Sequence, residues 1–262
     1  MNPVSICVGN HKGGVAKTTT VHALGRALAE RGYNVLLVDM DPQSSLSESC
    51  GISQEQSAGR SLADVLGGSR AGTLAMHDIL VKIGDRLTVA PSNIDMSITE
   101  LGLAARLVGR DSVLTKTLAP VKGEYDFVLV DSPPSLGMLS INAVTASDYI
   151  IIPSQPQTVD LRGLLLYRAT LSELRNGNGR RPHELGILLT FWSGYTLHKA
   201  AQQAMIDAGM HVFKTHIGRS VRVAESPEFG KSIIDYAPGN PRAQEYRALA
   251  EEVLTCLQSA KD

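Results

Sequence analysis

A pair of glycines between two lysines, within residues 12–19, constrains this chain more than any other stretch. Residues 4–8 before it are apolar and typical of a strand, and the apolar residues after Thr18 recur at helical spacing. The glycines therefore lie in a turn between a strand and a helix. Because glycine has no Cβ, the backbone N–H groups of Gly13 and Gly14 can close around a phosphate, which the helix N-terminus also attracts.

The side chains of this turn indicate a nucleotide and a metal. We expect Lys17 to meet the β and γ phosphates and the Thr18 hydroxyl to ligate Mg²⁺. Ala16 stands where the general P-loop pattern has glycine, so the stretch fits better the deviant form K-G-G-x-x-K-S/T, whose additional lysine is Lys12. Lys12 precedes the cradle, so its expected target is the nucleotide of another subunit. A glycine-rich turn with two solvated lysines is the alternative. The residues expected to contact nucleotide are Lys12, Gly13, Gly14, Val15, Ala16, Lys17, Thr18 and Thr19.

Two carboxylates, Asp39 and Asp41, lie at the end of the next apolar strand, residues 34–39. In open α/β sheets the ligand crevice lies at the carboxyl ends of the strands, which makes Asp39 and Asp41 candidates for phosphate chemistry. We expect Asp39 to hold water on the metal and Asp41, followed by the rigid Pro42, to orient an attacking water. An Asp-Pro turn that merely ends the strand is the alternative.

A third apolar strand, residues 125–131, also ends in an acid, Asp131. This is the position of a Walker B carboxylate, and we expect Asp131 to bind Mg²⁺ through water. Three strand ends thus carry phosphate-binding or metal-binding groups in the order that such a site requires.

These motifs resemble the ParA/Soj branch of the ParA/MinD deviant Walker ATPases. The similarity runs nearly end to end and includes residues 135–137, 141–148, 151–153, 186–190 and 221–231. The resemblance implies an ATP- and Mg²⁺-dependent ATPase that forms an ATP-induced sandwich dimer and binds DNA without sequence preference. It also implies slow hydrolysis that a ParB-like centromere-binding partner accelerates, in a cytoplasmic, nucleoid-associated protein.

The resemblance implies a P-loop NTPase, and the alternation of strands and helices predicts an α/β fold with a mainly parallel twisted sheet and helices on both faces. Length and composition agree with a single domain over residues 1–262. With 262 residues, 43% apolar and 19% charged, the chain can bury one large core, and no linker divides it. The turn-rich residues 176–182 lie between a helix and a strand. The three cysteines suggest neither disulfides nor zinc, and no apolar run approaches the length of a membrane span.

The pattern of apolar residues predicts the order of the elements. Strands are expected at 4–8, 34–39, 86–90, 125–131, 148–153, 185–190 and near 212–217; helices are expected at 17–31, 94–108, 138–146, 159–175, 197–208 and 242–257, with a helical excursion from 44 to 84.

The charge distribution adds a weak indication of a DNA surface. The formal net charge is −1, yet residues 151–262 carry 13 lysines and arginines against 11 acids. The resemblance assigns DNA contact to Arg222, with Arg219 in the same loop and Lys199 nearby. The chain departs from the family at Tyr195, where an arginine is usual, and at Gly218, which replaces a proline.

Three rival functions are compatible with parts of this pattern. A MinD-like membrane-cycling protein should end in a basic amphipathic helix, whereas residues 248–257 carry acids. A NifH-like reductase needs cluster-ligating cysteines, which are too few here. An ATPase that positions a protein cargo on the nucleoid differs only in its partner. With no helix-turn-helix before the first strand, sequence-specific operator binding is not expected.

Overall fold

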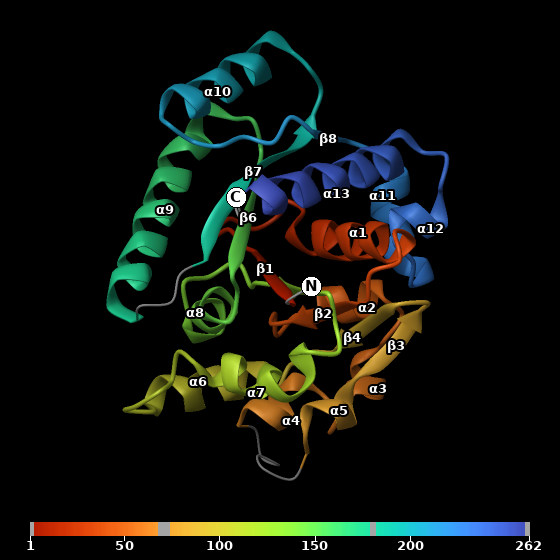
Figure 1. The fold of residues 1–262 in the computed structure, drawn as a ribbon, viewed down its shortest axis with the longest axis vertical. Helices are drawn as coiled ribbons and strands as arrows, with labels where there is room; N and C mark the ends of the chain where they lie inside the picture. The colour runs from red at the N-terminus through yellow and green to blue at the C-terminus, as the bar shows by residue number, and fades with distance from the viewer. Residues whose placement is uncertain (1–2, 68–73, 179–181, 260–262) are drawn as a thin grey trace.

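One sheet of eight strands runs through the part of the chain that the computed structural model describes, which is residues 3–67, 74–178 and 182–259 (Figure 1). The order of the strands is β3-β4-β2-β5-β1-β6-β7-β8, and all neighbours are parallel except β3 and β4. This confirms the expected mainly parallel sheet. The strands are β1 Val4–Val8, β2 Val35–Asp39, β3 Val81–Gly84, β4 Leu87–Ala90, β5 Phe127–Asp131, β6 Tyr149–Ser154, β7 His183–Trp192 and β8 Ile217–Gly218.

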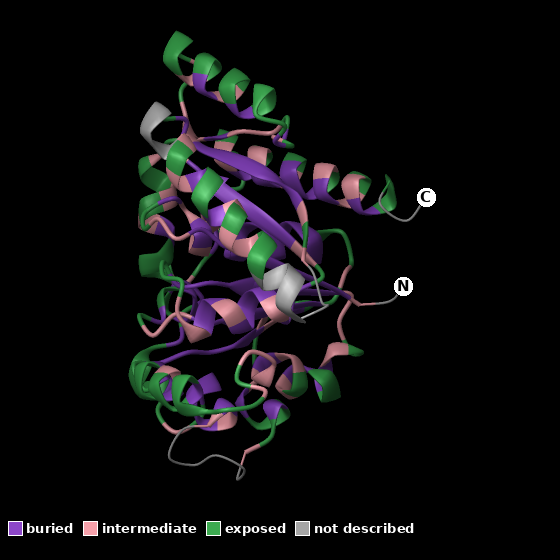
Figure 2. Ribbon diagram, turned by 90° about the vertical axis from the view of Figure 1, so that its left-hand side faces the viewer, coloured by how far each residue is buried: buried purple, intermediate pink, exposed green. Residues whose placement is uncertain are grey.

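Helices cover both faces of this sheet, so that the strands form a buried layer with exposed residues on the outer sides of the helices (Figure 2). One core cluster joins the sheet to α1, α2, α12 and α13, and the other joins it to α4–α10. The helices are α1 Lys17–Glu30, α2 Ser45–Ser49, α3 Gln54–Ser57, α4 Leu62–Leu66, α5 Met76–Ile79, α6 Met96–Ala105, α7 Val113–Lys122, α8 Met138–Thr145, α9 Thr158–Asn178, α10 Thr196–Asp207, α11 Val221–Glu225, α12 Ile233–Tyr236, α13 Pro241–Ser259 and the 3₁₀ turn η1 Ser226–Phe229.

The sequences of the central strands reflect burial on both faces of the sheet. Every residue of β1, β2 and β5 is buried, which explains why they are nearly continuous apolar runs rather than alternating ones. Helix α1 turns Val21, Leu24 and Leu28 toward the sheet at helical spacing.

Several expected elements differ in the structure. The expected helical excursion from 44 to 84 is wrong at its end, because Val81–Gly84 forms the antiparallel edge strand β3. Helix α7 lies in a region without an expected element, and α11, η1 and α12 fill the segment before α13. The strand expected near 212–217 is reduced to two residues of β8 and an isolated bridge at Val212. Of the turn expected at 176–182, residues 179–181 lie outside the described residues.

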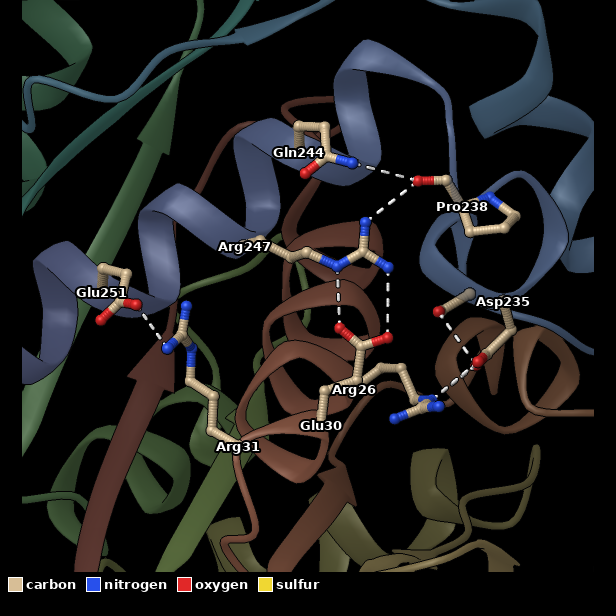
Figure 3. A network of polar contacts seen from close by, with 9 residues as sticks. Arg26, Glu30, Arg31, Asp235, Pro238, Gln244, Arg247 and Glu251 are labelled. Atoms are coloured by element: carbon tan, nitrogen blue, oxygen red, sulfur yellow. Dashed lines mark hydrogen bonds and ion pairs between the residues drawn. The ribbon is translucent and has the colours of Figure 1, made fainter.

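The C-terminal helix α13 is bound to α1 by packing and by charge (Figure 3). Its buried face includes Tyr246, Leu249 and Val253. Above this face, Arg247 donates to both carboxylate oxygens of Glu30, at 2.8 and 3.1 Å.

Further ion pairs extend this contact on the same side of α1. Arg31 pairs with Glu251 of α13, and Arg26 donates to Asp235 of α12 at 2.8 Å. The apolar face of α13 therefore lies in the core, and Glu251 pairs with α1. In the described ranges, we find no helix with the length and apolar character of a membrane span.

Candidate nucleotide-binding site

The carboxyl ends of β2, β5 and β1 meet because these strands are neighbours in the sheet. Asp131 pairs in register with Asp39 on one side and with Val8, the last residue of β1, on the other. The turn that follows β1 thus begins beside both acids. The convergence expected from three separate motifs is present in the structure, at the edge of the sheet where α/β proteins bind their ligands.

The turn between β1 and α1 exposes the start of the helix. Gly14 and Ala16 both have a left-handed backbone, with φ of 68° and 65°. Ala16 adopts this conformation although a side chain there costs about 1–2 kcal/mol. The N-terminus of α1 has no side-chain cap and no acid in its first turn. Its unpaired N–H groups and the positive end of the helix dipole are thus available to an anion.

Residues far along the chain hold this turn in place. Asn10 donates from its amide to the carbonyl of Pro153 at 2.8 Å and accepts from the N–H of Lys12 at 3.0 Å. Gln155 donates to the carbonyl of Gly14 at 3.0 Å. The sequence analysis did not identify Asn10 or Gln155, because nothing in their local pattern shows that β6 lies beside β1.

Lys17 is buried at the base of the turn. Its Nζ donates to the carbonyl of Lys12 at 2.9 Å. Burial lowers the pKa of Lys17, while the nearby carboxylates of Asp131 and Asp41 oppose the shift. The ammonium group thus lies near both carboxylates at the start of α1, where a cation can also neutralise phosphate.

Thr18 and Asp131 provide oxygen atoms that fit a magnesium ion. Thr18 Oγ1 donates to Asp131 Oδ2 at 2.7 Å, and the other oxygen, Oδ1, is buried without a hydrogen-bond partner. An unpaired buried carboxylate oxygen is costly unless a cation or water completes it. Hydroxyl and carboxylate oxygens are ligands that Mg²⁺ prefers, so these two residues fit the expected metal.

Asp39 lies beside Asp131 but uses its oxygens differently. Its Oδ2 accepts from the N–H and the hydroxyl of Ser47, at 2.9 and 2.7 Å, and its Oδ1 accepts from the N–H of Asp41. Burial raises the pKa of Asp39 to about 6, and burial together with the charge of Asp39 raises the pKa of Asp131 well above its usual value. Asp39 therefore anchors the segment after β2 to α2, and its role at the metal stays a prediction.

Asp41 is half-buried at the entrance to the same site. Its Oδ1 accepts from the N–H of Gln43 at 2.9 Å, and its carbonyl accepts from Ser92 Oγ at 2.7 Å. These bonds hold the backbone around Asp41 in place. Its role as the residue that orients the attacking water stays a prediction.

Of the two residues at the start of the turn, His11 lies against helix α9 and Lys12 is half-buried. The His11 ring is 5.8 Å from that of Tyr167, and a Cβ at Gly163 would come within 3.1 Å of it. The His11 side chain therefore packs between the turn at residues 12–19 and helix α9. The reach of Lys12 to a second subunit is untested and stays a prediction.

An apolar cavity of about 700 Å³ adjoins the turn. Gly14, Ala16 and Thr19 form the side next to the phosphate cradle, and Phe191 and Ile217 belong to the apolar wall. A planar base is chemically suited to such a wall. Sequence patterns did not identify this cavity, since its walls come from β7, β8 and α11, which are remote in sequence.

The three residues expected at DNA lie outside the phosphate cradle. Arg219, Arg222 and Lys199 are all exposed. Arg222 Nη1 donates to Glu225 at 3.1 Å, and the guanidinium of Arg219 lies 5.1 Å from the centre of the Phe191 ring. Arg242 fills the space that a side chain at Gly218 would need.

Comparison with known proteins places this site in a family. Residues 4–180 match the family described as an AAA domain. The chain is 39% identical to the chromosome-partitioning ATPase Soj of Thermus thermophilus over 257 residues, which cover 97% of each chain. It is 36% identical to the sporulation initiation inhibitor protein Soj of Bacillus subtilis, over 95% of this chain and 97% of that protein.

A solved structure agrees with these relatives. The cobyrinic acid a,c-diamide synthase of Mycobacterium smegmatis, with bound ATP analog and magnesium, superposes with a TM-score of 0.84 and 32% identity, over 98% of this chain and 97% of that chain. Because the domain match spans residues 4–180 and the similarity to Soj and ParA proteins extends over nearly the whole length, the chain belongs to the Soj/ParA family of chromosome-partitioning ATPases.

Proposed function

We propose that residues 1–262 act as one ATPase domain that partitions DNA in the cytoplasm, in association with the nucleoid. ATP would occupy the turn at residues 12–19, and hydrolysis would control a dimer that binds DNA. The observation that carries this proposal is the pair Thr18 and Asp131, whose hydrogen bond leaves one buried carboxylate oxygen unpaired beside Lys17.

Thr18 and Asp131 would hold Mg²⁺, and Asp39 would act on it through water. The ion supplies positive charge that neutralises the phosphate oxygens. The N–H groups of residues 13–19 would bind the phosphates, Lys17 would neutralise the charge that develops on them, and Asp41 would orient the attacking water. No covalent intermediate is needed. The bound ATP analog and magnesium of the mycobacterial synthase support this assignment.

A dimer would form when two subunits close across their nucleotides, each Lys12 reaching the phosphates of the other site. The backbone of Lys12 is fixed on both sides, by Asn10 and by Lys17, so its side chain leaves the loop from a defined point. Such preorganisation favours a directed contact between subunits.

Duplication of the surface around Arg219, Arg222 and Lys199 would then give useful affinity for double-stranded DNA. If each subunit makes about 3 phosphate contacts and the dimer about 6, the salt exponent changes from roughly −3 to roughly −5. A ParB-like protein on a centromere-like site would accelerate hydrolysis and release the dimer. The names of the Soj and ParA relatives support partition of DNA. The apolar face of α13 is buried in the core, so this helix does not offer that face to a lipid surface.

The nucleotide part is tested by the affinity for a fluorescent ATP analogue with Mg²⁺ or with EDTA. Asp131→Asn should bind nucleotide with little response to Mg²⁺ and should lose hydrolysis. The matched control is Asp126→Asn, which removes a half-buried carboxylate just before the other end of β5. An Asp131→Asn variant with Mg²⁺-dependent binding and hydrolysis like the wild type would contradict the proposal.

The DNA part is tested by retention of a DNA duplex on the protein with ATP, with ADP and without nucleotide. Retention should require ATP. Equal retention in all three states would separate DNA binding from the nucleotide and remove the proposed cycle.

A further inference from the structure

Strand β7 passes into α10 near the upper end of the molecule (Figure 1). Three aromatic rings from this passage lie close to a fourth, His216, from the segment before β8. Trp192 stacks on His216 with ring centres 4.2 Å apart and lies 5.5 Å from His198, which is in turn 5.8 Å from Tyr195. We refer to Trp192, Tyr195, His198 and His216 as the aromatic platform. None of its members takes part in the nucleotide site.

Hydrogen bonds hold the inner rings of the platform in place. His198 Nδ1 accepts from the N–H of Ser193 at 3.2 Å, and Gln202 Nε2 lies 3.1 Å from His216 Nε2. These bonds hold His198 and His216 beside Trp192.

Its outer member is open to solvent. Tyr195 is 70% exposed and begins α10 without a side-chain cap bond. An aromatic side chain stabilises a fold through its burial. A phenol ring with this exposed fraction therefore has no role in the core. Tyr195 thus presents a planar surface to a ligand.

A cavity of about 300 Å³ lies between this ring and the loop after β6. Tyr195 and His198 line one part and Arg219 another, and among the described residues that line it none is acidic. The exposed Lys199 follows His198 in α10. Planar rings beside cations, without an opposing carboxylate, match a ligand that carries planar bases on a chain of phosphates.

We propose that the aromatic platform binds single-stranded DNA, with unpaired bases stacking on Tyr195 and phosphates contacting Arg219 and Lys199. This inference rests on the proposed DNA function and deepens it by naming the form of DNA. A base inside a duplex has both faces covered by its neighbours, so an exposed ring can stack only where a strand is unpaired or opened. Stacking tolerates any sequence because every base has a π-face.

The chain provides its own reporter, because Trp192 is its single tryptophan. The experiment is a titration of the full-length protein, loaded with ATP analogue and Mg²⁺, with a short oligothymidylate while Trp192 fluorescence is recorded. A duplex of the same length is titrated in parallel. We expect the oligothymidylate to quench the emission, and Tyr195→Ala to weaken its binding by about tenfold with little effect on the duplex.

The matched control is Tyr195→Phe, which keeps the ring and should bind the oligothymidylate within about twofold of wild type. Nucleotide affinity, measured for each variant, shows that the fold is intact. Tyr195→Ala with wild-type affinity for the oligothymidylate would overturn the inference, as would a wild-type protein that binds the duplex but not the single strand. A wild-type protein that binds neither DNA would overturn the proposed DNA function as well.

Discussion

Thr18 and Asp131, 113 residues apart in sequence, are joined by a hydrogen bond of 2.7 Å from the Thr18 hydroxyl to one oxygen of the carboxylate. The bond links the first turn of α1 to the end of β5, and so links the phosphate cradle to the proposed metal carboxylate. The bond therefore fixes the position of the phosphate cradle relative to the Asp131 carboxylate.

Replacement of Thr18 by alanine should weaken this site at the metal. Thr18→Ala removes the hydroxyl and the hydrogen bond, and the Mg²⁺ concentration for half-maximal hydrolysis should rise about 10- to 100-fold. Thr18→Ser keeps the hydroxyl and should stay close to wild type. Similar Mg²⁺ requirements for alanine and serine would remove Thr18 from the metal site.

Replacement of Asp41 should separate hydrolysis from binding. Asp41→Ala should lower the hydrolysis rate about 10²- to 10⁴-fold, because a positioned carboxylate of this kind contributes that much to proton transfer or water orientation. ATP binding should persist, so the dimer accumulates, as light scattering would show. Asp85→Ala, which removes an exposed carboxylate in the turn between β3 and β4, is the control. Unchanged hydrolysis in Asp41→Ala would rule out its assigned role.

Replacement of Arg222 by glutamate should abolish binding of duplex DNA and leave ATP binding unchanged, since Arg222 lies outside the cradle. Lys82→Glu makes the same charge change on the exposed edge strand β3 and should bind DNA normally. Gel shifts at several salt concentrations are the measurement. If Arg222→Glu still shifts DNA at moderate salt, the DNA surface lies elsewhere.

His22 should make the fold sensitive to mild acid. Burial lowers its pKa to about 4, from an unfolded value near 6.5. Between these values the unfolded chain binds a proton that the folded chain does not, so stability falls as pH falls from about 6.5 toward 4. From pH 7 to pH 5 the loss from this one group is about 2 kcal/mol.

The comparison that isolates this effect uses His22→Gln. Asp39, whose pKa is raised, shifts stability in the opposite direction in both proteins and cancels. Urea unfolding at pH 7 and pH 5 should show wild type losing about 2 kcal/mol more than the variant. Parallel pH dependences would show that His22 is not the group responsible.

The sequence predicted the parts of the fold that local patterns encode. The apolar runs of β1, β2 and β5, the glycine turn after β1 and the acids at the ends of β2 and β5 predicted where the site lies, and the register of Asp39, Asp131 and Val8 shows why. Strand β3 was missed because an exposed edge strand shows no pattern of burial: Val81, Lys82 and Gly84 are all exposed. Helix α7 carries Leu114, Leu118 and Val121 at helical spacing, but Pro120 obscured it.

The rest of the site depends on packing that no local pattern contains. Asn10 contacts Pro153 across 143 residues, and Gln155 contacts Gly14 across 141. Such contacts follow from the placement of β6 beside β1, which tertiary structure decides. Of the aromatic platform, the sequence singled out Tyr195 alone, as a departure from the family. The other rings come from β7, α10 and the segment before β8, which only the fold brings together.

The most direct test of the account is the mass of the protein, by light scattering, with a non-hydrolysable ATP analogue. Wild type and the control Lys82→Ala should form dimers. Lys12→Ala should bind the analogue with nearly normal affinity yet remain a monomer, because it lacks the cation that completes the partner's phosphate site. A Lys12→Ala protein that dimerises like wild type would contradict the coupling of nucleotide to assembly.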